Sequence, residues 1–313
     1  MLVAGSESPG AVEYLHQLAK VTPLQMVDED AVSTIDWSGV RGVVVGTTLG
    51  DAVLDKTLIA TARRYGKPSV ACIDHWSWYR ERFATANGLL LPDWIVVNDQ
   101  IAREQACAAG LPDERLFVGG NPVIEARHYQ VSTSQSLAPD SLKSDYGLTR
   151  NGRIVLYVSE DLASDFGSGS DSLLGYDEFQ VADLIKQVLR RNEKMVIKLH
   201  PSDSPRKYRH LGDEVAVIAK APVDHMAVFS DVIVGTASML LLELAVYRND
   251  IVSFRPHPKK SFIGDEIGAT VAVRTADQFR WAIDNHQTTG VKFGQHYVGS
   301  ARAIADFIDE VTR

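Results

Sequence analysis

The chain has 313 residues, of which 45 % are hydrophobic and 23 % are charged, a balance typical of a soluble globular protein. Its length exceeds that of a usual single domain and favours two domains that share a cleft. The net charge is −8 and no long Lys/Arg run is present, which argues against nucleic acid as a partner and allows at most peripheral membrane association, because such partners require clustered positive charge.

The two cysteines, Cys72 and Cys107, have no metal-ligand spacing and do not indicate a disulfide framework, which suits a reducing compartment. The N-terminal segment is too short and too polar to be a signal peptide, and no apolar run reaches membrane-spanning length. We therefore expect a cytoplasmic protein.

The first part of the chain alternates between short apolar runs and helical patterns. Strands are expected at residues 1–5, 22–28, 41–48, 68–76, 93–99 and 115–122, and helices at 9–20, 50–66 and 100–110. The apolar runs are continuous Val/Ile stretches, which indicates strands covered on both faces. Strands separated by helices predict right-handed βαβ units and a parallel sheet.

The composition then changes and a second α/β series begins. Residues 131–152 are rich in Ser, Asp and Gly with little periodicity, and they are predicted to form a linker or long loop. Strands are expected after it at 153–161, 194–201, 214–220, 231–238, 250–254 and 270–275, and helices at 176–192, 222–230, 239–248, 276–286 and 300–313.

The predicted fold class is α/β, with two Rossmann-like domains that face each other across a cleft. The domains are residues 1–130 and 153–296, and a C-terminal helix at 297–313 has the first domain as its candidate packing partner. Ligands on such sheets bind beyond the carboxyl ends of the strands, so polar residues at those ends are the candidates for chemistry.

The segment "KLHP" ends one predicted strand of the second domain. Lys198 and His200 lie on the same face of this strand by its period of two, and Pro201 ends the ladder by removing an N–H. An imidazole can donate a hydrogen bond to a phosphate or protonate a leaving group. The alternative is a surface histidine at an ordinary strand end, with Lys198 paired to a nearby carboxylate.

The segment "GTASMLLLE" begins where another predicted strand turns into a helix. Gly235 ends the strand, and Thr236 and Ser238 add hydroxyl groups at the helix N-terminus, which offers unpaired N–H groups to a phosphate. The alternative is that one hydroxyl is only the helix N-cap.

Together, "KLHP" and, about thirty residues later, "GTASMLLLE" resemble a pattern shared by bacterial transferases of the GT-B fold. These are sialyltransferases, Kdo-type transferases and CDP-glycerol glycerophosphotransferases. The resemblance implies that His200, Pro201, Thr236 and Ser238 hold the phosphate of a CMP or CDP donor, and that Glu243 meets its ribose. The chain departs from the pattern by having Thr-Ala-Ser in place of adjacent hydroxyls.

Glu160 and Asp161 follow the first strand of the second domain. An inverting transfer requires a carboxylate that takes the proton of the acceptor hydroxyl. Sialyltransferases have an acidic pair in a comparable loop, so the resemblance implies this role here. A solvated loop is the alternative.

Two segments of the first domain are candidates for binding the acceptor. "GTT" at Gly46, Thr47 and Thr48 precedes a helix and is either a binding turn or a tight strand-to-helix connection. In "CIDHWSWYRERF", Asp74 and His75 end a buried strand, and an adjacent ionisable pair at a strand end is a candidate catalytic site.

The same segment supplies Trp76 and Arg80, which are suited to stacking on a sugar and to pairing with a carboxylate or phosphate. The alternative for Trp76 is packing beneath a loop.

These residues predict a metal-independent, cofactor-free glycosyltransferase. It would move a sugar from a nucleotide donor, with a CMP-linked nonulosonic acid or Kdo favoured, to a surface polysaccharide or another glycan acceptor. One rival is a hydrolysing UDP-sugar 2-epimerase of the same fold, which product analysis would separate. The other is a non-catalytic two-domain protein that binds a ligand without turnover.

Overall fold

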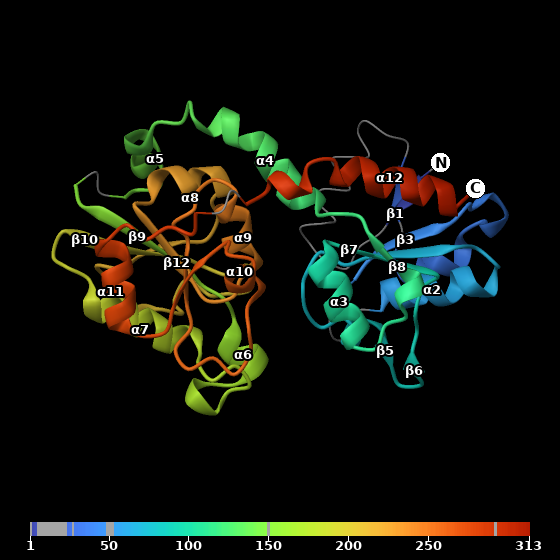
Figure 1. Cartoon of the computed structure of the whole chain (residues 1–313), viewed down its shortest axis with the longest axis horizontal. Coiled ribbons are helices and arrows are strands. Elements are labelled where there is room, and N and C mark those ends of the chain that lie inside the picture. The colour runs from blue at the N-terminus through green and yellow to red at the C-terminus, as the bar shows by residue number, and fades with distance from the viewer. Residues whose placement is uncertain (1, 5–23, 27, 48–52, 149–150, 291–292) are drawn as a thin grey trace. The chain divides into compact units, whose positions relative to one another are not determined.

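A computed structural model describes residues 2–4, 24–26, 28–47, 53–148, 151–290 and 293–313. The chain divides into two compact units (Figure 1). Unit 1 comprises Met1–Pro122 and Gly299–Arg313, and unit 2 comprises Val123–Val298. Each unit is built on a parallel sheet with helices, as the alternation of strand and helix patterns predicts.

Unit 1 contains a four-stranded parallel sheet in the order β3-β4-β7-β8. Its strands are β3 (Val43–Gly46), β4 (Ser69–Cys72), β7 (Trp94–Val97) and β8 (Leu116–Val118). Its helices are α2 (Leu54–Arg64), α3 (Gln100–Ala108) and α12 (Ser300–Val311). Strands β1 (Leu2–Ala4) and β2 (Leu24–Met26) form a separate parallel pair, and β5 (Ala84–Thr85) and β6 (Gly88–Leu89) form an antiparallel pair. The helix expected at 9–20 lies outside the described residues.

The C-terminal helix α12 belongs to unit 1 although the chain reaches it last (Figure 1). Its Phe307 stacks on Phe117 of β8 with ring centroids 3.9 Å apart and meets Trp94 of β7 edge-on at 5.6 Å. At its N-terminus, the Ser300 hydroxyl accepts a hydrogen bond from the Asn121 amide at 3.0 Å. One aromatic face and one buried hydroxyl therefore fix the helix to the sheet of this unit.

Unit 2 contains a six-stranded parallel sheet in the order β11-β10-β9-β12-β13-β14. Its strands are β9 (Arg153–Val158), β10 (Glu193–Lys198), β11 (Ala216–Ile218), β12 (Val232–Gly235), β13 (Val252–Phe254) and β14 (Val271–Val273). Its helices are α4 (Pro122–Ser134), which begins at the unit boundary, α5 (Pro139–Asp145), α6 (Leu162–Phe166), α7 (Glu178–Val188), α8 (Val223–Phe229), α9 (Met239–Ala245), α10 (Ile263–Glu266) and α11 (Ala276–Asp284). The strand order reverses direction between β9 and β12, which makes this pair the topological switch point of the sheet.

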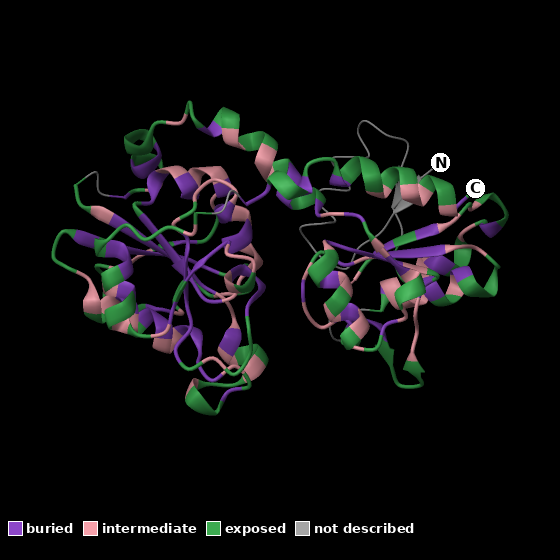
Figure 2. Ribbon diagram, in the orientation of Figure 1, coloured by how far each residue is buried: buried purple, intermediate pink, exposed green. Residues whose placement is uncertain are grey.

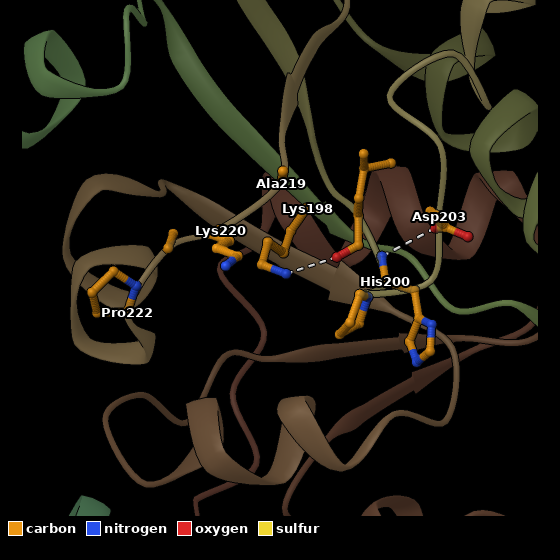
Figure 3. A pocket seen from close by; sticks show the side chains of 9 residues that line it. Lys198, His200, Asp203, Ala219, Lys220 and Pro222 are labelled. Carbon is orange, nitrogen blue, oxygen red and sulfur yellow. Dashed lines mark hydrogen bonds between the residues drawn. The ribbon is translucent and has the colours of Figure 1, made fainter. Parts of the chain in front are cut away.

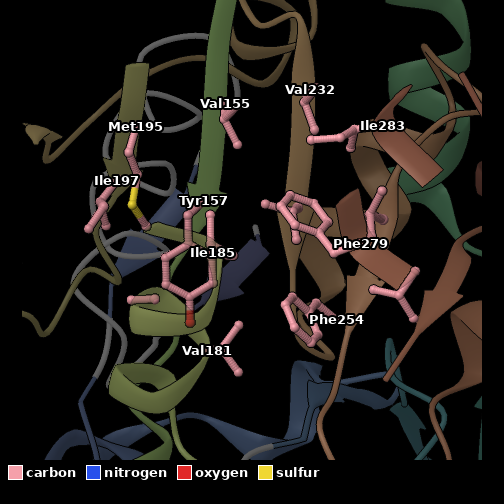
Figure 4. Close-up of a cluster of buried hydrophobic side chains, with 14 of the residues drawn as sticks. Val155, Tyr157, Val181, Ile185, Met195, Ile197, Val232, Phe254, Phe279 and Ile283 are labelled. Atoms are coloured by element: carbon pink, nitrogen blue, oxygen red, sulfur yellow. The ribbon is translucent and has the colours of Figure 1, made fainter. Parts of the chain in front are cut away.

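The core of unit 2 explains why its strand sequences are apolar without alternation. Alternate side chains of β9, including Tyr157, pack with Ile185 of α7 and Phe279 of α11 on one face of the sheet (Figure 4). The other alternate side chains, such as Leu156, are also 0 % exposed, so the strand is buried on both faces (Figure 2). Full burial of each large apolar side chain contributes about 1.5–3 kcal/mol.

The segment predicted as a linker at 131–152 contains helical structure. The last four residues of α4 and all of α5 lie in it, and the boundary between the units follows Pro122 rather than residue 130. Proline starts both helices, as it can at a first helical position. The sequence of α4 has no apolar stripe that would predict a helix. In agreement with this, the helix buries only Ile124, Glu125 and Ser134.

Candidate functional site

Two predicted site residues meet at the topological switch point of unit 2. Glu160 follows β9 and Thr236 follows β12, the two strands between which the sheet order reverses. The Thr236 hydroxyl donates a hydrogen bond to Glu160 Oε2, and the backbone N–H of Ala237 donates to the same oxygen at 3.0 Å. The Glu160 carboxylate therefore occupies the donors at the start of the β12–α9 turn, which the sequence assigned to a phosphate.

The environment of Glu160 favours its protonated form. Burial raises the pKa of Glu160 above its ordinary value, and the hydrogen bonds from Thr236 and Ala237, which favour the carboxylate, offset this rise only in part. Glu178 lies near enough to raise the pKa of Glu160 further, whereas Arg255 lowers it. A carboxylate whose pKa is raised is a stronger base than an ordinary carboxylate and is suited to accept a proton.

Two residues that are not among the predicted site residues, Ser253 and Arg255, hold Thr236 through a chain of hydrogen bonds. The Ser253 hydroxyl donates to the backbone oxygen of Thr236 at 2.9 Å and accepts from Arg255 Nε at 3.2 Å. Arg255 is 3 % exposed and forms an ion pair with Asp265. The sequence "FRPHPKK" allows either a basic segment that helps to neutralise a donor phosphate or a basic surface loop, and the burial of Arg255 within it depends on the fold.

Asp161 lies beside Glu160 but in a different setting. It is half-buried, its Oδ1 is 3.2 Å from Lys207 Nζ, and its Oδ2 accepts a hydrogen bond from Ser202 at 3.3 Å. Ser202 belongs to the loop that follows His200. The structure therefore brings together the acidic pair and the histidine loop, which are separated by forty residues in the sequence.

His200 is exposed and is held by its own loop. Its backbone N–H donates to Asp203 Oδ2 at 3.0 Å, and its Nδ1 lies 2.6 Å from the Ser202 hydroxyl and accepts from the Ser202 backbone N–H at 3.4 Å. Because a backbone N–H can only donate, Nδ1 acts as an acceptor and the neutral ring carries its proton on Nε2. His200 can thus present an N–H donor to a ligand.

A pocket of about 410 Å³ opens at the carboxyl ends of β10 and β11 (Figure 3). It is lined by Lys198, Leu199, His200, Pro201, Asp203, Ala219, Lys220, Ala221 and Pro222. Two lysines supply positive charge, the histidine supplies an N–H donor, and alanine and proline side chains supply an apolar wall. Such a mixture is suited to an anionic ligand with a flat apolar part.

Lys198 contributes to this pocket from a buried position. Its side-chain Nζ donates to the backbone oxygen of Leu199 at 2.7 Å (Figure 3). Burial lowers the pKa of Lys198, while the nearby Asp203 acts in the opposite direction. The alternative pairing with a carboxylate is not seen among the described ion pairs, and Lys198, Leu199 and His200 all line the pocket. Strand β10 ends at Lys198, before Pro201.

The remaining donor-site residues have local partners. The Ser238 hydroxyl accepts the backbone N–H of Leu240 at 3.2 Å and is the N-cap of α9. Glu243 pairs with Arg127 of α4 at 2.7 Å. At Gly235, an added Cβ would lie 3.0 Å from a methyl carbon of Leu241, so this position favours glycine.

The candidate residues of unit 1 differ in exposure. Asp74 is exposed, Arg80 is exposed, and Trp76 is 5 % exposed, with its indole N–H donating to Asp99 at 2.8 Å. The packing alternative thus describes Trp76. Gly46 ends β3, and Thr48 lies outside the described residues.

His75 and Thr47 both lie near a buried arginine, Arg82, which is not one of the predicted site residues. Arg82 is 6 % exposed and donates to both the backbone oxygen and the hydroxyl of Thr47 at 3.0 Å. Burial, followed by the charge of Arg82, lowers the pKa of His75 to about 4, although Asp74 opposes the shift. His75 is therefore neutral at physiological pH, with its Nδ1 2.8 Å from the Ser77 hydroxyl.

The described residues include no group of three or more His, Cys, Asp or Glu side chains placed to hold a metal ion. No helix in the described part of the chain is long and apolar enough to cross a membrane.

No protein-family model and no curated protein matches the sequence. Solved structures do resemble the chain. HepE from Anabaena in complex with UDP-glucose has a TM-score of 0.66 at 13 % identity, over 98 % of this chain and 91 % of that chain. S. aureus MnaA with UDP has a TM-score of 0.65 at 14 % identity, over 98 % of this chain and 88 % of that chain.

The UDP-GlcNAc 2-epimerase from Neisseria meningitidis, bound to UDP-GlcNAc, has a TM-score of 0.63 at 15 % identity, over 90 % of this chain and 79 % of that chain. At these identities the likeness concerns the architecture alone. The chain has the GT-B fold, composed of two Rossmann-like domains.

Proposed function

We propose that the protein is a nucleotide-sugar-dependent enzyme whose unit 2 binds the nucleotide. The observation that carries this proposal is the pocket beside His200, which combines Lys198, Lys220 and an imidazole donor at the carboxyl ends of β10 and β11. Parallel α/β sheets bind ligands at this edge, close to the switch point. The solved structures that share the fold include complexes with UDP, UDP-glucose and UDP-GlcNAc, which supports a ligand of this class.

In the proposed site, the two lysines neutralise the phosphate and His200 Nε2–H donates a hydrogen bond to it. Thr236 is fully buried and its hydroxyl is engaged by Glu160, so we assign Thr236 to positioning Glu160 rather than to direct phosphate binding. Ser238 and Glu243 remain candidate contacts at the edge of the site, the latter toward a ribose. Each has a protein partner that a ligand would need to replace.

For transfer, we assign Glu160 as the proton acceptor, with Asp161 as the other candidate. The acceptor hydroxyl gives its proton to the carboxylate while its oxygen forms a bond to the anomeric carbon of the sugar. The bond between that carbon and the phosphate oxygen breaks with its electron pair, and the departing nucleotide carries the negative charge. His200 and the lysines stabilise this charge, which grows in the transition state.

The donor has two candidate classes. The resemblance of "KLHP" and "GTASMLLLE" to CMP-sugar transferases implies a CMP-linked nonulosonic acid or Kdo, with a surface polysaccharide or other glycan as acceptor. The complexes of the same fold contain uridine nucleotides. We place UDP-sugars first because the fold likeness covers 90 % or more of the chain, whereas the motif resemblance covers two short segments.

A hydrolysing epimerase is the second candidate function, favoured by the likeness to UDP-GlcNAc 2-epimerases. The two are separated by incubating the protein with UDP-glucose, UDP-GlcNAc or a CMP-linked sugar, with and without a glycan acceptor, and analysing the products by mass spectrometry. A transferase gives a glycosylated acceptor, and an epimerase gives a free sugar of altered configuration without an acceptor. Absence of nucleotide release from all of these donors would contradict the proposed function.

A further inference from the structure

Lys207 lies in the segment after β10 and contacts three carboxylates from three different segments. Its Nζ is 2.6 Å from Asp203 of the His200 loop, 2.7 Å from Glu178 of α7 and 3.2 Å from Asp161 at the start of α6. The same Nζ donates to the backbone oxygen of Glu160 at 3.0 Å. One ammonium group thus joins the acidic loop to the histidine loop.

These ion pairs are largely removed from water. The side chain of Lys207 is 9 % exposed, that of Asp203 is 1 % exposed and that of Glu178 is 0 % exposed. An exposed ion pair contributes little to the stability of the fold. Removing one partner of a buried ion pair leaves an uncompensated buried charge, which is destabilising. Here, loss of the ammonium would leave three carboxylates facing one another.

Asp203 carries the connection from Lys207 to the histidine. Its Oδ1 pairs with Lys207, while its Oδ2 accepts the backbone N–H of His200 at 3.0 Å and the Ser159 hydroxyl at 3.2 Å. The position of the His200 backbone therefore depends on a carboxylate whose orientation depends on Lys207.

We propose that Lys207 is a positioning residue that fixes the His200 loop relative to the Glu160–Asp161 loop, so that the proton acceptor and the leaving-group donor keep one geometry. This inference rests on the proposed function. Lys207 does not itself line the pocket, but it contacts Asp203, which does. Its contribution is to hold two reacting groups that come from different loops, and a displacement of about 1 Å in such a geometry can lower the rate about a hundredfold.

The charged and titratable groups that face Lys207 come from every segment around it. They are Asp161, Glu178, Asp203 and Tyr208, and the Phe179 ring lies 5.5 Å from Nζ. Burial acts to lower the pKa of Lys207, but the hydrogen bonds to Asp203 and Glu178 outweigh it and raise that pKa. Lys207 therefore stays charged throughout the working pH range.

The test uses the full chain with Lys207→Met, Lys207→Gln and Lys207→Arg. Turnover of the UDP-sugar that the wild type uses is measured across pH, UDP affinity is measured by calorimetry, and exchange of the His200 amide hydrogen is measured without substrate. The matched control is Lys186→Met on α7, which removes a more exposed lysine paired with Glu214 at 2.7 Å.

The neutral variants are expected to keep UDP affinity near that of the wild type and to lose kcat about a hundredfold. The acid limb of the pH–rate profile should move to higher pH by about one unit or more, because facing carboxylates favour protonation when their counter-charge is removed. The His200 amide should exchange faster. Lys207→Arg should return the acid limb toward its original position with an intermediate kcat, and Lys186→Met should leave all three measurements unchanged.

Unchanged kcat and pH profile in a folded neutral variant would overturn the proposal, whether or not the amide exchanges faster. If neither neutral variant folds, Lys207→Arg decides: the proposal requires a reduced kcat, and wild-type kcat would overturn it. If the wild type neither binds UDP nor turns over any donor, the proposed function fails, and unaltered exchange at His200 in the variants would then contradict the coupling itself.

Discussion

Glu160 is half-buried, and its carboxylate accepts hydrogen bonds from two donors, the Thr236 hydroxyl and the Ala237 backbone N–H. Glu160→Gln keeps the shape of the side chain but removes its ability to accept a proton. We expect kcat to fall by about 10²–10⁴-fold with little change in nucleotide affinity. Asp161→Asn is the comparison, and full turnover in both variants would move the proton acceptor elsewhere, with Asp74 as the next candidate.

The same substitution has an expected effect on stability. Burial raises the pKa of Glu160, so the folded chain holds this proton more tightly than the unfolded chain does. The charged side chain then costs stability increasingly as pH rises from the unfolded pKa through the folded pKa. Urea denaturation at several pH values should show the stability of Glu160→Gln, relative to wild type, increasing over this window. A constant difference would contradict the assigned pKa direction.

His75 gives the opposite pH dependence in unit 1. Its pKa is lowered to about 4, mainly by burial, so the unfolded chain binds this proton more tightly. The contribution of neutral His75 to the stability of unit 1 is fully present above the unfolded pKa of about 6.5 and decreases as pH falls toward about 4, by on the order of 3 kcal/mol. Replacing His75 with Gln should flatten the stability of unit 1 across this range, and an unchanged slope would mean that His75 is already exposed to water.

At the scale of elements, helix α12 is held mainly through Phe307. The ring is half-buried and stacks on Phe117, so Phe307→Ala is expected to destabilise unit 1 by about 2 kcal/mol. Arg302→Ala, on an exposed i,i+4 pair with Asp306, should change stability by less than about 0.5 kcal/mol. Equal effects of the two substitutions in chemical denaturation would contradict this packing.

The strands of both sheets could be predicted because their apolar runs are long and continuous, which requires burial on two faces. Helix α4 could not, because it lacks an apolar stripe and its serines and threonines are typical of loops. The site follows the same rule. The position of "KLHP" could be predicted, because the carboxyl ends of parallel strands lie at one edge of the sheet. The contact between Glu160 and Thr236 could not, because it depends on which strands are neighbours in the sheet.

For a related reason, the sequence did not predict the roles of Lys207, Ser253 and Arg255. A lysine or arginine in a polar segment is usually solvated, and only the folded chain surrounds Lys207 with three carboxylates and buries Arg255 against Asp265. Conversely, Trp76 was a candidate for sugar stacking, but its ring lies in the core.

At the scale of the whole molecule, the two units have separate cores and the nucleotide is assigned to unit 2. UDP at one hundred times its Kd should stabilise unit 2 by about 2.7 kcal/mol. Four of the five tryptophans lie in unit 1, and Trp281 is the fifth. In Trp281→Phe, fluorescence therefore reports unit 1 alone, while circular dichroism reports both units.

We expect UDP to raise the midpoint of the unit 2 transition seen by circular dichroism and to leave the fluorescence transition in place. A shift of the fluorescence transition alone would assign the nucleotide to unit 1. EDTA should leave turnover unchanged, because the proposed phosphate partners are Lys198, His200 and Lys220. Loss of turnover that Mg²⁺ or Mn²⁺ restores would contradict this assignment.

Calorimetric titration of UDP into the wild type, His200→Ala and His296→Ala tests the central claim most directly, with CMP titrated in parallel. His296 is an exposed histidine of the same unit and does not line the pocket. A hydrogen bond to a charged partner contributes about 1.5–3 kcal/mol, so His200→Ala should weaken binding about ten- to a hundredfold while His296→Ala binds as the wild type does. Equal affinity of the wild type and a folded His200→Ala, or no binding of either nucleotide to the wild type, would contradict the placement of a nucleotide at this pocket.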